Sequence, residues 1–278
     1  MATNPRPYAD LAVLASRPDC EIDLAAGALS ISAAENPQLD PEPCLRRLDR
    51  WAEELRPCMA EATGDLARVQ TLCRFLYEQK GLRGNRDCYY DPRNSFLDQV
   101  LERRLGIPIT LAVVLLDVGR RVDVPLVGVG FPGHFLVRHA CHLHLLLDPF
   151  DGGNLLTQGD CAEILQRVTR NRIPFSPQLL QAVTPRQILL RILNNLCGIY
   201  LSRDDVDRAL SVVERKRLLY PDEPGYLRER GVLRLKAGRC AEGLADLEGY
   251  LEARPDAPDW DQIAALAEKV RERSGFVH

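Results

Sequence analysis

Hydrophobic residues in the first part of the chain recur at spacings of three and four, the period of an amphipathic helix. In GDLARVQTLCRFLYEQK, for example, Leu66, Val69 and Leu76 fall on one helical face. Proline and glycine separate three such segments, which predict helices over residues 21–32, 41–56 and 64–80. We therefore expect an N-terminal helical bundle over residues 1–80.

The middle of the chain changes from helical to strand-like patterns. Residues 81–93 (GLRGNRDCYYDPR) show no sustained period and predict an irregular loop. Gly106 then ends one helix, and Pro108 begins another that is apolar on nearly every side and must be buried. After Pro125 the segments LVGVGF, HFLVR and CHLHLLLD predict three strands of an antiparallel sheet. These patterns predict an α+β core over residues 81–175.

The sequence pattern of residues 184–278 predicts helices with an internal repeat. Ala209 fits the small position of a second helix and Pro221 closes the first unit, while Gly243 and Pro255 stand 34 residues further on. The expected inner-face residues are Leu193, Leu196, Tyr200, Leu227, Gly231, Leu247 and Tyr250. The segment DWDQIAALAEKVRERSG has one apolar and one charged face, as a capping helix requires. The period predicts two tetratricopeptide-type hairpins that bind a protein or peptide, although unrelated helices could share it.

Composition narrows the function classes. The 36 Lys and Arg residues are balanced by 39 Asp and Glu residues, so the chain has no positive excess for nucleic acid. Its start lacks the apolar block of a signal peptide, and it has no apolar run that suits a bilayer crossing. We therefore expect a cytoplasmic location with no membrane partner. Nine cysteines without a CxxC pair indicate reduced, buried thiols, and no cofactor is expected.

Four of the five histidines are clustered, at positions 134, 139, 142 and 144. On a strand beginning near Cys141, His142, His144 and Asp148 would share one face, where imidazole and carboxylate groups can ligate zinc. However, no second ligand pair lies elsewhere in the sequence, and a closed site needs about four ligands. The pattern therefore favours a solvent-facing strand and no metal.

His134 stands apart from this cluster. It follows the turn Gly130-Phe131-Pro132-Gly133 and opens a strand, while Asp148 closes the next strand. In a hairpin these two ends lie side by side, so the carboxylate can hold one ring nitrogen and leave the other to act as a base. His134 and Asp148 therefore make up half of a nucleophile-His-Asp triad.

Three strings in order carry a family resemblance: DPRNSFLDQVLERRLGIPITLAVVLLDVGRR, VGVGFPGHFLVRH and LLLDPFDGGNLLT. With helices before them and repeats after, the chain resembles the bacterial SirB family over about residues 20–255. This resemblance implies a transglutaminase-like (papain-like) core followed by tetratricopeptide-like repeats. In the wider superfamily a cysteine stands at the amino end of the buried helix, and a histidine and an aspartate follow on the next two strands.

The resemblance implies that His134 and Asp148 correspond to the histidine and aspartate of the superfamily. It places the nucleophile near Pro108, where this chain has no cysteine. Because proline has no group that can attack, the comparison implies that catalysis has been lost. Two substitutes are the hydroxyl of Thr110 and the thiol of Cys88. The alternative function is therefore a cysteine- or threonine-dependent hydrolase or acyltransferase with a displaced nucleophile. A metal-dependent enzyme using the histidine strand is a weaker third class.

The loop before the buried helix is unusually polar. It contains the candidate binding residues Asn85, Arg86, Tyr89, Tyr90, Asp91 and Asn94, together with Asp87 and Arg93. These side chains either line a recognition pocket or form a hydrogen-bonded plug, and the plug is favoured because Asp and Asn beside turns satisfy local backbone groups. The sequence thus predicts a degenerate transglutaminase-like protein that binds a protein or peptide and acts indirectly in regulation.

Overall fold

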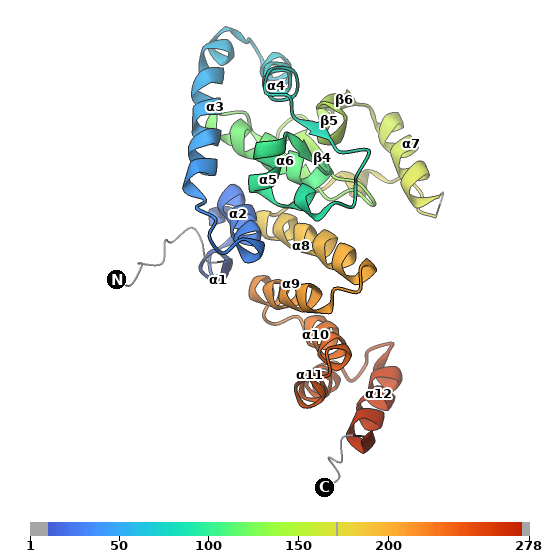
Figure 1. The fold of residues 1–278 in the computed structure, drawn as a ribbon. Helices are drawn as coiled ribbons and strands as arrows, with labels where there is room; N and C mark the ends of the chain where they lie inside the picture. The colour runs from blue at the N-terminus through green and yellow to red at the C-terminus, as the bar shows by residue number, and fades with distance from the viewer. Residues whose placement is uncertain (1–10, 171, 274–278) are drawn as a thin grey trace. The chain divides into compact units, whose positions relative to one another are not determined.

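The structure, a computed structural model, describes residues 11–170 and 172–273. The chain divides into two compact units, Met1–Ile192 and Leu193–His278, which Figure 1 shows in blue to yellow and in orange to red. The first unit combines helices with a sheet, and the second unit is helical.

The helices of the first unit follow the predicted period. They are α1 (Leu11–Ala15), α2 (Leu24–Glu35), α3 (Glu42–Glu61), α4 (Asp65–Cys73), α5 (Leu97–Arg103), α6 (Pro108–Arg121) and α7 (Gln158–Thr169). Four short turns of 3-10 helix join them, at Asp19–Glu21, Pro92–Ser95, Pro149–Asp151 and Pro177–Leu180, and a π-helical turn, Arg74–Gln79, continues α4. The three predicted N-terminal helices are therefore confirmed, with α3 longer than expected.

Helix α6 lies at the centre of the first unit, with α5 and strand β4 beside it in Figure 1. It packs against α2 and α3 on one side and against the sheet on the other. Eleven of its residues are buried, which agrees with its apolar sequence on nearly every side. Pro108 occupies the first turn, as predicted, where its missing N–H is not needed by the helix.

The prediction that Gly106 ends a helix is wrong. Helix α5 ends earlier, at Arg103, and the next residue, Arg104, caps it in the left-handed conformation with φ of 61°. Gly106 instead lies in strand β2 (Leu105–Gly106), which pairs in parallel with β1 (Arg83–Gly84). A Cβ atom at Gly106 would lie 2.9 Å from Thr110 Oγ1, so glycine is needed there for close approach rather than for helix termination.

The main sheet has the strand order β6-β5-β4-β3-β7, and all neighbouring strands are antiparallel. Its strands are β3 (Leu126–Val129), β4 (Leu136–His139), β5 (Leu146–Asp148), β6 (Asn154–Leu156) and β7 (Ala182–Val183). The predicted antiparallel sheet is therefore confirmed, although the described part has more strands than the three predicted. Valine and leucine side chains of β3, β4 and β5 are buried in it.

The predicted strand beginning near Cys141 is too long. Residues 141–145 form a turn, because His139 Nδ1 accepts hydrogen bonds from the backbone N–H groups of Cys141 and His142, both at 3.2 Å. The Leu145 N–H then closes the turn on the His142 carbonyl at 3.0 Å. His142 and His144 therefore do not share a strand face with Asp148, and the predicted alternation is wrong.

The second unit consists of antiparallel helix pairs. Its helices are α9 (Val206–Leu219), α10 (Gly225–Lys236), α11 (Cys240–Ala253) and α12 (Trp260–Arg273), preceded by α8 (Pro185–Ser202), which crosses the unit boundary. Gly231 of α10 and Gly243 of α11 meet closely, because a Cβ atom on either would lie 3.0 Å from the backbone oxygen of the other. Leu196, Tyr200 and Leu247 are buried, which confirms the predicted repeat register.

Candidate functional site

His134 and Asp148 form a hydrogen bond, with His134 Nε2 and Asp148 Oδ1 separated by 2.9 Å. His134 comes from the turn two residues before β4, and Asp148 ends β5, the neighbouring strand. The expected contact is therefore confirmed, although His134 precedes its strand rather than opening it. The second ring nitrogen of His134 makes no hydrogen bond with any described residue.

The Asp148 carboxylate is fixed by its own chain. Its Oδ1 atom also accepts the Phe150 N–H at 2.9 Å, and its carbonyl accepts the Gly153 N–H at 2.8 Å. Gly153 has φ of 70°, and a Cβ atom there would lie 2.5 Å from the Tyr77 ring. The DPFDGG sequence therefore shapes a tight turn that aims the aspartate at His134.

Arg191 supports the turn that carries His134. Its Nη2 atom donates to the carbonyls of Phe131 at 2.6 Å and His134 at 2.5 Å, and its guanidinium lies 5.7 Å from the Phe135 ring centroid. Burial lowers the pKa of the Arg191 guanidinium. Sequence reasoning missed this residue, because an arginine 57 positions from His134 carries no local signal.

A cleft of about 750 Å³ opens beside the pair, and both His134 and Asp148 line it. Phe150 forms one wall, with its ring 6.2 Å from the His134 ring. The Arg86 guanidinium lies over the Phe150 ring, 5.1 Å from its centroid, and donates to Asp151 Oδ1 at 2.6 Å. The charged residues of the lining are Arg86, Asp148, Asp151, Asp160, Glu163 and Arg167. The cleft thus contains a hydrogen-bonded histidine and aspartate, surrounded by side chains of both charges.

Pro108 and Thr110, which the sequence analysis placed at the nucleophile position or offered as its substitute, both lie in the first turn of α6. Pro108 is buried in the first turn of α6. Thr110 is fully buried, and its Oγ1 donates to the Asn94 carbonyl at 2.7 Å while accepting the Ile107 N–H at 3.2 Å. The Thr110 hydroxyl therefore holds the helix start and the preceding loop, which is a structural use.

Among the described residues, no cysteine thiol is hydrogen-bonded to His134. Cys73 and Cys161 are buried, and burial raises their thiol pKa values to about 12 and about 11. Cys88 is exposed, and no hydrogen bond joins it to His134 among the described residues. All nine cysteines are free thiols, but the prediction that they are buried is wrong for Cys20, Cys58, Cys88, Cys141 and Cys240, which are exposed.

The polar loop is organised around two buried asparagines. Asn85 Nδ2 donates to Asn94 Oδ1 at 3.0 Å, and Asn85 Oδ1 accepts the Cys88 N–H at 3.1 Å. Asn94 Nδ2 in turn donates to the carbonyls of Cys88 at 2.7 Å and Tyr89 at 3.1 Å. These bonds favour the hydrogen-bonded plug over a recognition pocket, since both amides are used inside the loop.

The other candidate binding residues of the loop either form contacts within the protein or are exposed to solvent. Asp91 pairs with Arg93 at 2.7 Å and Arg103 at 3.6 Å, so it supports the loop. The Tyr89 ring lies 5.8 Å from the Phe150 ring, while Tyr90 is 74% exposed. Of the six predicted binding residues, Arg86 is the one that lines the cleft.

A second cluster joins Asp65 to His139 and His142, whose ligand atoms lie within 4.8 Å of one another. His142 Nε2 bonds Asp65 Oδ2 at 2.7 Å. Because His139 Nδ1 accepts two backbone N–H groups, the proton of its neutral ring lies on Nε2, so Nε2 is a donor and not a metal ligand. The chemistry of this cluster therefore does not suit a metal. Asp65, 77 residues before His142, was not predictable from local spacing.

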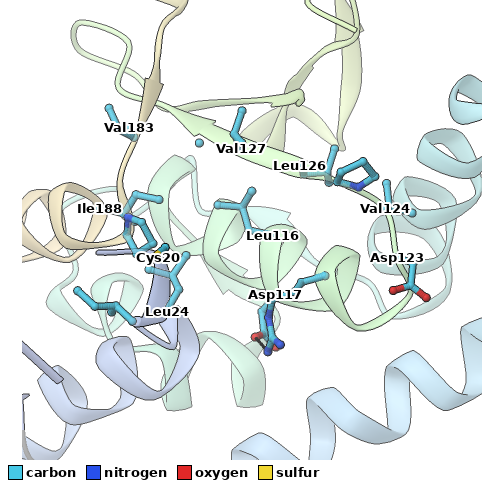
Figure 2. A pocket seen from close by; sticks show the side chains of 15 residues that line it. Cys20, Leu24, Leu116, Asp117, Asp123, Val124, Leu126, Val127, Val183 and Ile188 are labelled. Carbon is cyan, nitrogen blue, oxygen red and sulfur yellow. Dashed lines mark hydrogen bonds and ion pairs between the residues drawn. The ribbon is translucent and has the colours of Figure 1, made fainter. Parts of the chain in front are cut away.

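Figure 2 shows another cavity of the first unit, of about 560 Å³. Aliphatic side chains of Leu24, Leu116, Val127 and Ile188 surround it. Its buried Asp117 is already neutralised by ion pairs to two arginines, at 3.1 Å and 2.6 Å. Among the described residues that line it, no histidine or paired carboxylates could serve as acid and base.

Comparison with known proteins agrees with both parts of the fold. Residues 42–194 match the family described as the transglutaminase-like superfamily, and residues 196–268 match tetratricopeptide repeats. No solved structure matches the chain. Within the described part, no helix combines the length and apolar character needed to cross a membrane.

Two curated relatives cover most of the chain, and a third covers about half of it. A UPF0162 protein of Xylella fastidiosa is 39% identical over 254 residues, which is 90% of each chain. A UPF0162 protein of Vibrio cholerae is 30% identical over 85% of this chain and 88% of its own. F-box only protein 21 of Homo sapiens is 31% identical over 162 residues, 53% of this chain and 24% of that protein.

Proposed function

The chain belongs to the transglutaminase-like superfamily and to the UPF0162 proteins, and from this premise we propose that it is a non-catalytic member that binds a protein or peptide. Its repeats supply the binding surface, since tetratricopeptide repeats generally mediate protein interactions. The finer resemblance to the SirB family, a cytoplasmic location and an indirect regulatory role belong to the same proposal. So does a division into residues 1–80, 81–175 and 184–278.

The observation that carries the proposal is the start of α6. The superfamily places its cysteine there, whereas this chain has Pro108, which has no attacking atom. The hydroxyl of Thr110, two residues further on, is buried and donates to the Asn94 carbonyl. His134 and Asp148 are then the retained half of a triad, held in place by Arg191 and the Gly153 turn.

A second candidate function rests on Cys88. Its thiol is exposed, and the next residue, Tyr89, contacts Phe150, which contacts His134. A movement of this loop would bring a thiol toward a base, as a cysteine-dependent hydrolase or acyltransferase requires. Against it stand the Asn85 and Asn94 bonds, which fix the Cys88 backbone on both sides.

The two functions are separated by capturing partners with the intact protein and its variants, using cross-linking and mass spectrometry. The binding function expects the same captured protein with Cys88→Ala, Thr110→Val and His134→Ala, because none of these residues contributes to the repeat surface. Gly231→Leu should abolish capture, because the leucine would collide with the Gly243 backbone. Capture that depends on Cys88 and His134 and survives Gly231→Leu would refute the proposal in favour of the enzyme.

A further inference from the structure

Strand β3 has a partner on only one side along its first half. It pairs with β4 over all four of its residues, but with β7 only at Gly128 and Val129. Continued along the chain, this register would bring Pro185 opposite Leu126. Pro185 has no N–H to donate and begins helix α8, so β7 cannot extend that far. Among the described residues, Leu126 therefore lies at an open edge of the sheet.

The backbone groups of Leu126 point toward this open edge. The Ala140 N–H donates to the Pro125 carbonyl at 2.8 Å, so Pro125 and, two residues on, Val127 direct their backbone groups toward β4. Leu126 lies between them and directs its N–H and C=O to the other side, because successive residues of an antiparallel strand alternate. No strand of the described chain accepts or donates there, which leaves one donor and one acceptor for a ligand.

The cavity of about 560 Å³ lies at this edge and is mainly aliphatic. Figure 2 shows Leu126 and Val127 of β3 along one border, with Leu24, Leu116 and Ile188 below them in the view. All of these except Ile188 are only half-buried, so a ligand can reach them. The volume lies within the range of about 300–1,000 Å³ that is usual for ligand pockets.

The charged residues that line the cavity are Asp117, Arg120 and Asp123, which together carry one net negative charge. Asp117 is buried in its ion pairs, as described above. Asp123 is exposed, and no described cation pairs with its carboxylate. Its carbonyl accepts Arg68 Nη2 at 3.2 Å, which holds this residue in place after α6. A basic group on a ligand would therefore complement the charge of this site.

We propose that the open edge of β3 and this cavity bind an extended segment of a partner protein. The segment's backbone bonds Leu126, a branched aliphatic side chain enters the cavity, and a neighbouring lysine or arginine pairs with Asp123. In strand addition of this kind, main-chain hydrogen bonds give affinity and a side-chain pocket gives specificity. The site lies in the first unit, so this inference goes beyond the repeat surface of the proposed function and does not depend on it.

Cys20 reports on the occupancy of this site without any mutation, because it lines the cavity and is an exposed free thiol. The probe is a synthetic peptide in which valine alternates with serine between two terminal lysines. With the full chain, this valine peptide should slow the alkylation of Cys20 by iodoacetamide severalfold, as measured by peptide mass spectrometry. The exposed thiols of Cys58 and Cys240, which do not line the cavity, should react at an unchanged rate.

Two altered peptides separate the parts of the interaction. A peptide with serine in place of every valine lacks the aliphatic side chains and should not protect Cys20. A peptide with proline in place of its central valine lacks the N–H that an added strand needs and should not protect Cys20 either.

Fluorescence polarisation of the fluorescein-labelled valine peptide tests the charge of the site. Asp123 has φ of 57°, and asparagine tolerates this left-handed conformation, so Asp123→Asn should fold like the parent protein. Its affinity for the peptide should fall about two- to fivefold, the usual effect of one exposed ion pair. Asp204→Asn is the matched control, because Asp204 is also exposed and left-handed, with φ of 55°, but lies in the second unit. It should bind the peptide like the parent protein.

Several outcomes would overturn the inference. They are an unprotected Cys20, equal protection by the proline peptide, and equal peptide affinity of the Asp123→Asn and Asp204→Asn proteins. Protection by decanoate but not by the peptide would also overturn it, because the cavity would then take a small apolar molecule. Protection of Cys20 that rises with protein concentration alone would assign the site to a second copy of this chain instead. Partner capture by the repeats, tested with Gly231→Leu, would stand or fall separately from each of these results.

Discussion

The polar loop of the first unit and the arginines Arg217, Arg230 and Arg234 of the second differ in how their side chains are paired. In the loop, the Asn85 and Asn94 side-chain amides bond each other and the backbone of Cys88 and Tyr89. In the second unit, Arg230 and Arg234 bind Asp246, whereas the half-buried Arg217 makes no hydrogen bond or ion pair with a described residue. Amides that are used inside a loop stabilise that loop, whereas a guanidinium without such bonds does not.

The largest expected effect tests how much the polar loop stabilises the first unit. Asn94→Ala removes the fully buried amide that serves Asn85, Cys88 and Tyr89. Each buried group left without a partner costs about 1–3 kcal/mol, so the free energy of unfolding should fall by about 3 kcal/mol or more. Denaturant unfolding in a Trp260→Phe background measures it, because the other of the two tryptophans, Trp51, is buried in α3 of the first unit.

Asn154→Ala is the control for that experiment. Asn154 is an exposed asparagine whose side chain bonds Asp151 at 3.2 Å. Its loss should change the free energy of unfolding by no more than about 0.5 kcal/mol. Similar effects of the two alanines would contradict the view that the loop is a buried plug.

The next effect concerns the helix crossing of the second unit. A side chain at Gly231 would place its Cβ 2.8 Å from Leu247 and 3.0 Å from the Gly243 oxygen, and backbone cannot give way as a side chain can. Gly231→Leu should therefore destabilise the second unit by about 1–3 kcal/mol. The change is read from Trp260 fluorescence during unfolding of a Trp51→Phe background.

Gly198→Ala is the matched control in α8, because no atom lies within 4 Å of a Cβ placed there. It should stabilise the helix by about 0.5–1 kcal/mol. A Gly231→Leu protein as stable as its parent would mean that α10 and α11 do not cross as closely as the structure has them.

A smaller effect depends on pH. Burial lowers the pKa of His139, with a raising effect of Asp65 and lowering effects of His142 and His144. Because the unfolded ring has a pKa of about 6.5, the unfolded chain binds more protons below that pH, and stability falls as pH drops from about 7 to about 5. In His139→Asn this fall should be smaller, whereas the exposed His144→Asn should retain it. An equal pH dependence in all three proteins would contradict a buried neutral His139.

Local patterns predicted most elements of the fold, and long-range contacts account for the errors. The period of three and four predicted α2, α3 and α4, and Pro108 predicted the start of α6, because these signals act within one helical turn. The turn at 141–145 was missed, because a histidine ring, and not a turn residue, makes it. Gly106 was wrongly predicted to end a helix, because the reason for glycine there is its close contact with the Thr110 side chain, which local sequence patterns do not reveal.

The candidate site shows the same division. His134 and Asp148 were predictable, because a hairpin brings the ends of its strands together. Arg191 was not, because its contact spans 57 residues. The pairing state of Arg217 could not be predicted either, since a sequence rich in Arg and Asp does not reveal which charge is left over after packing.

The last prediction is that the labelling rate of Cys88 does not change, and it tests directly whether His134 activates a thiol. A thiol-directed acylating probe should label Cys88 at the rate of the other exposed thiols, Cys20, Cys58, Cys141 and Cys240, because no described base is bonded to it. His134→Ala should leave that rate unchanged, since the His134 ring is bonded to Asp148 and not to a thiol. Peptide mass spectrometry over a time course gives each rate separately. If Cys88 reacted far faster than the other four, and slowed in His134→Ala, the loop would move in solution to complete a triad. The polar loop would then serve catalysis as well as stability, and its paired amides would no longer mark it as a purely structural element.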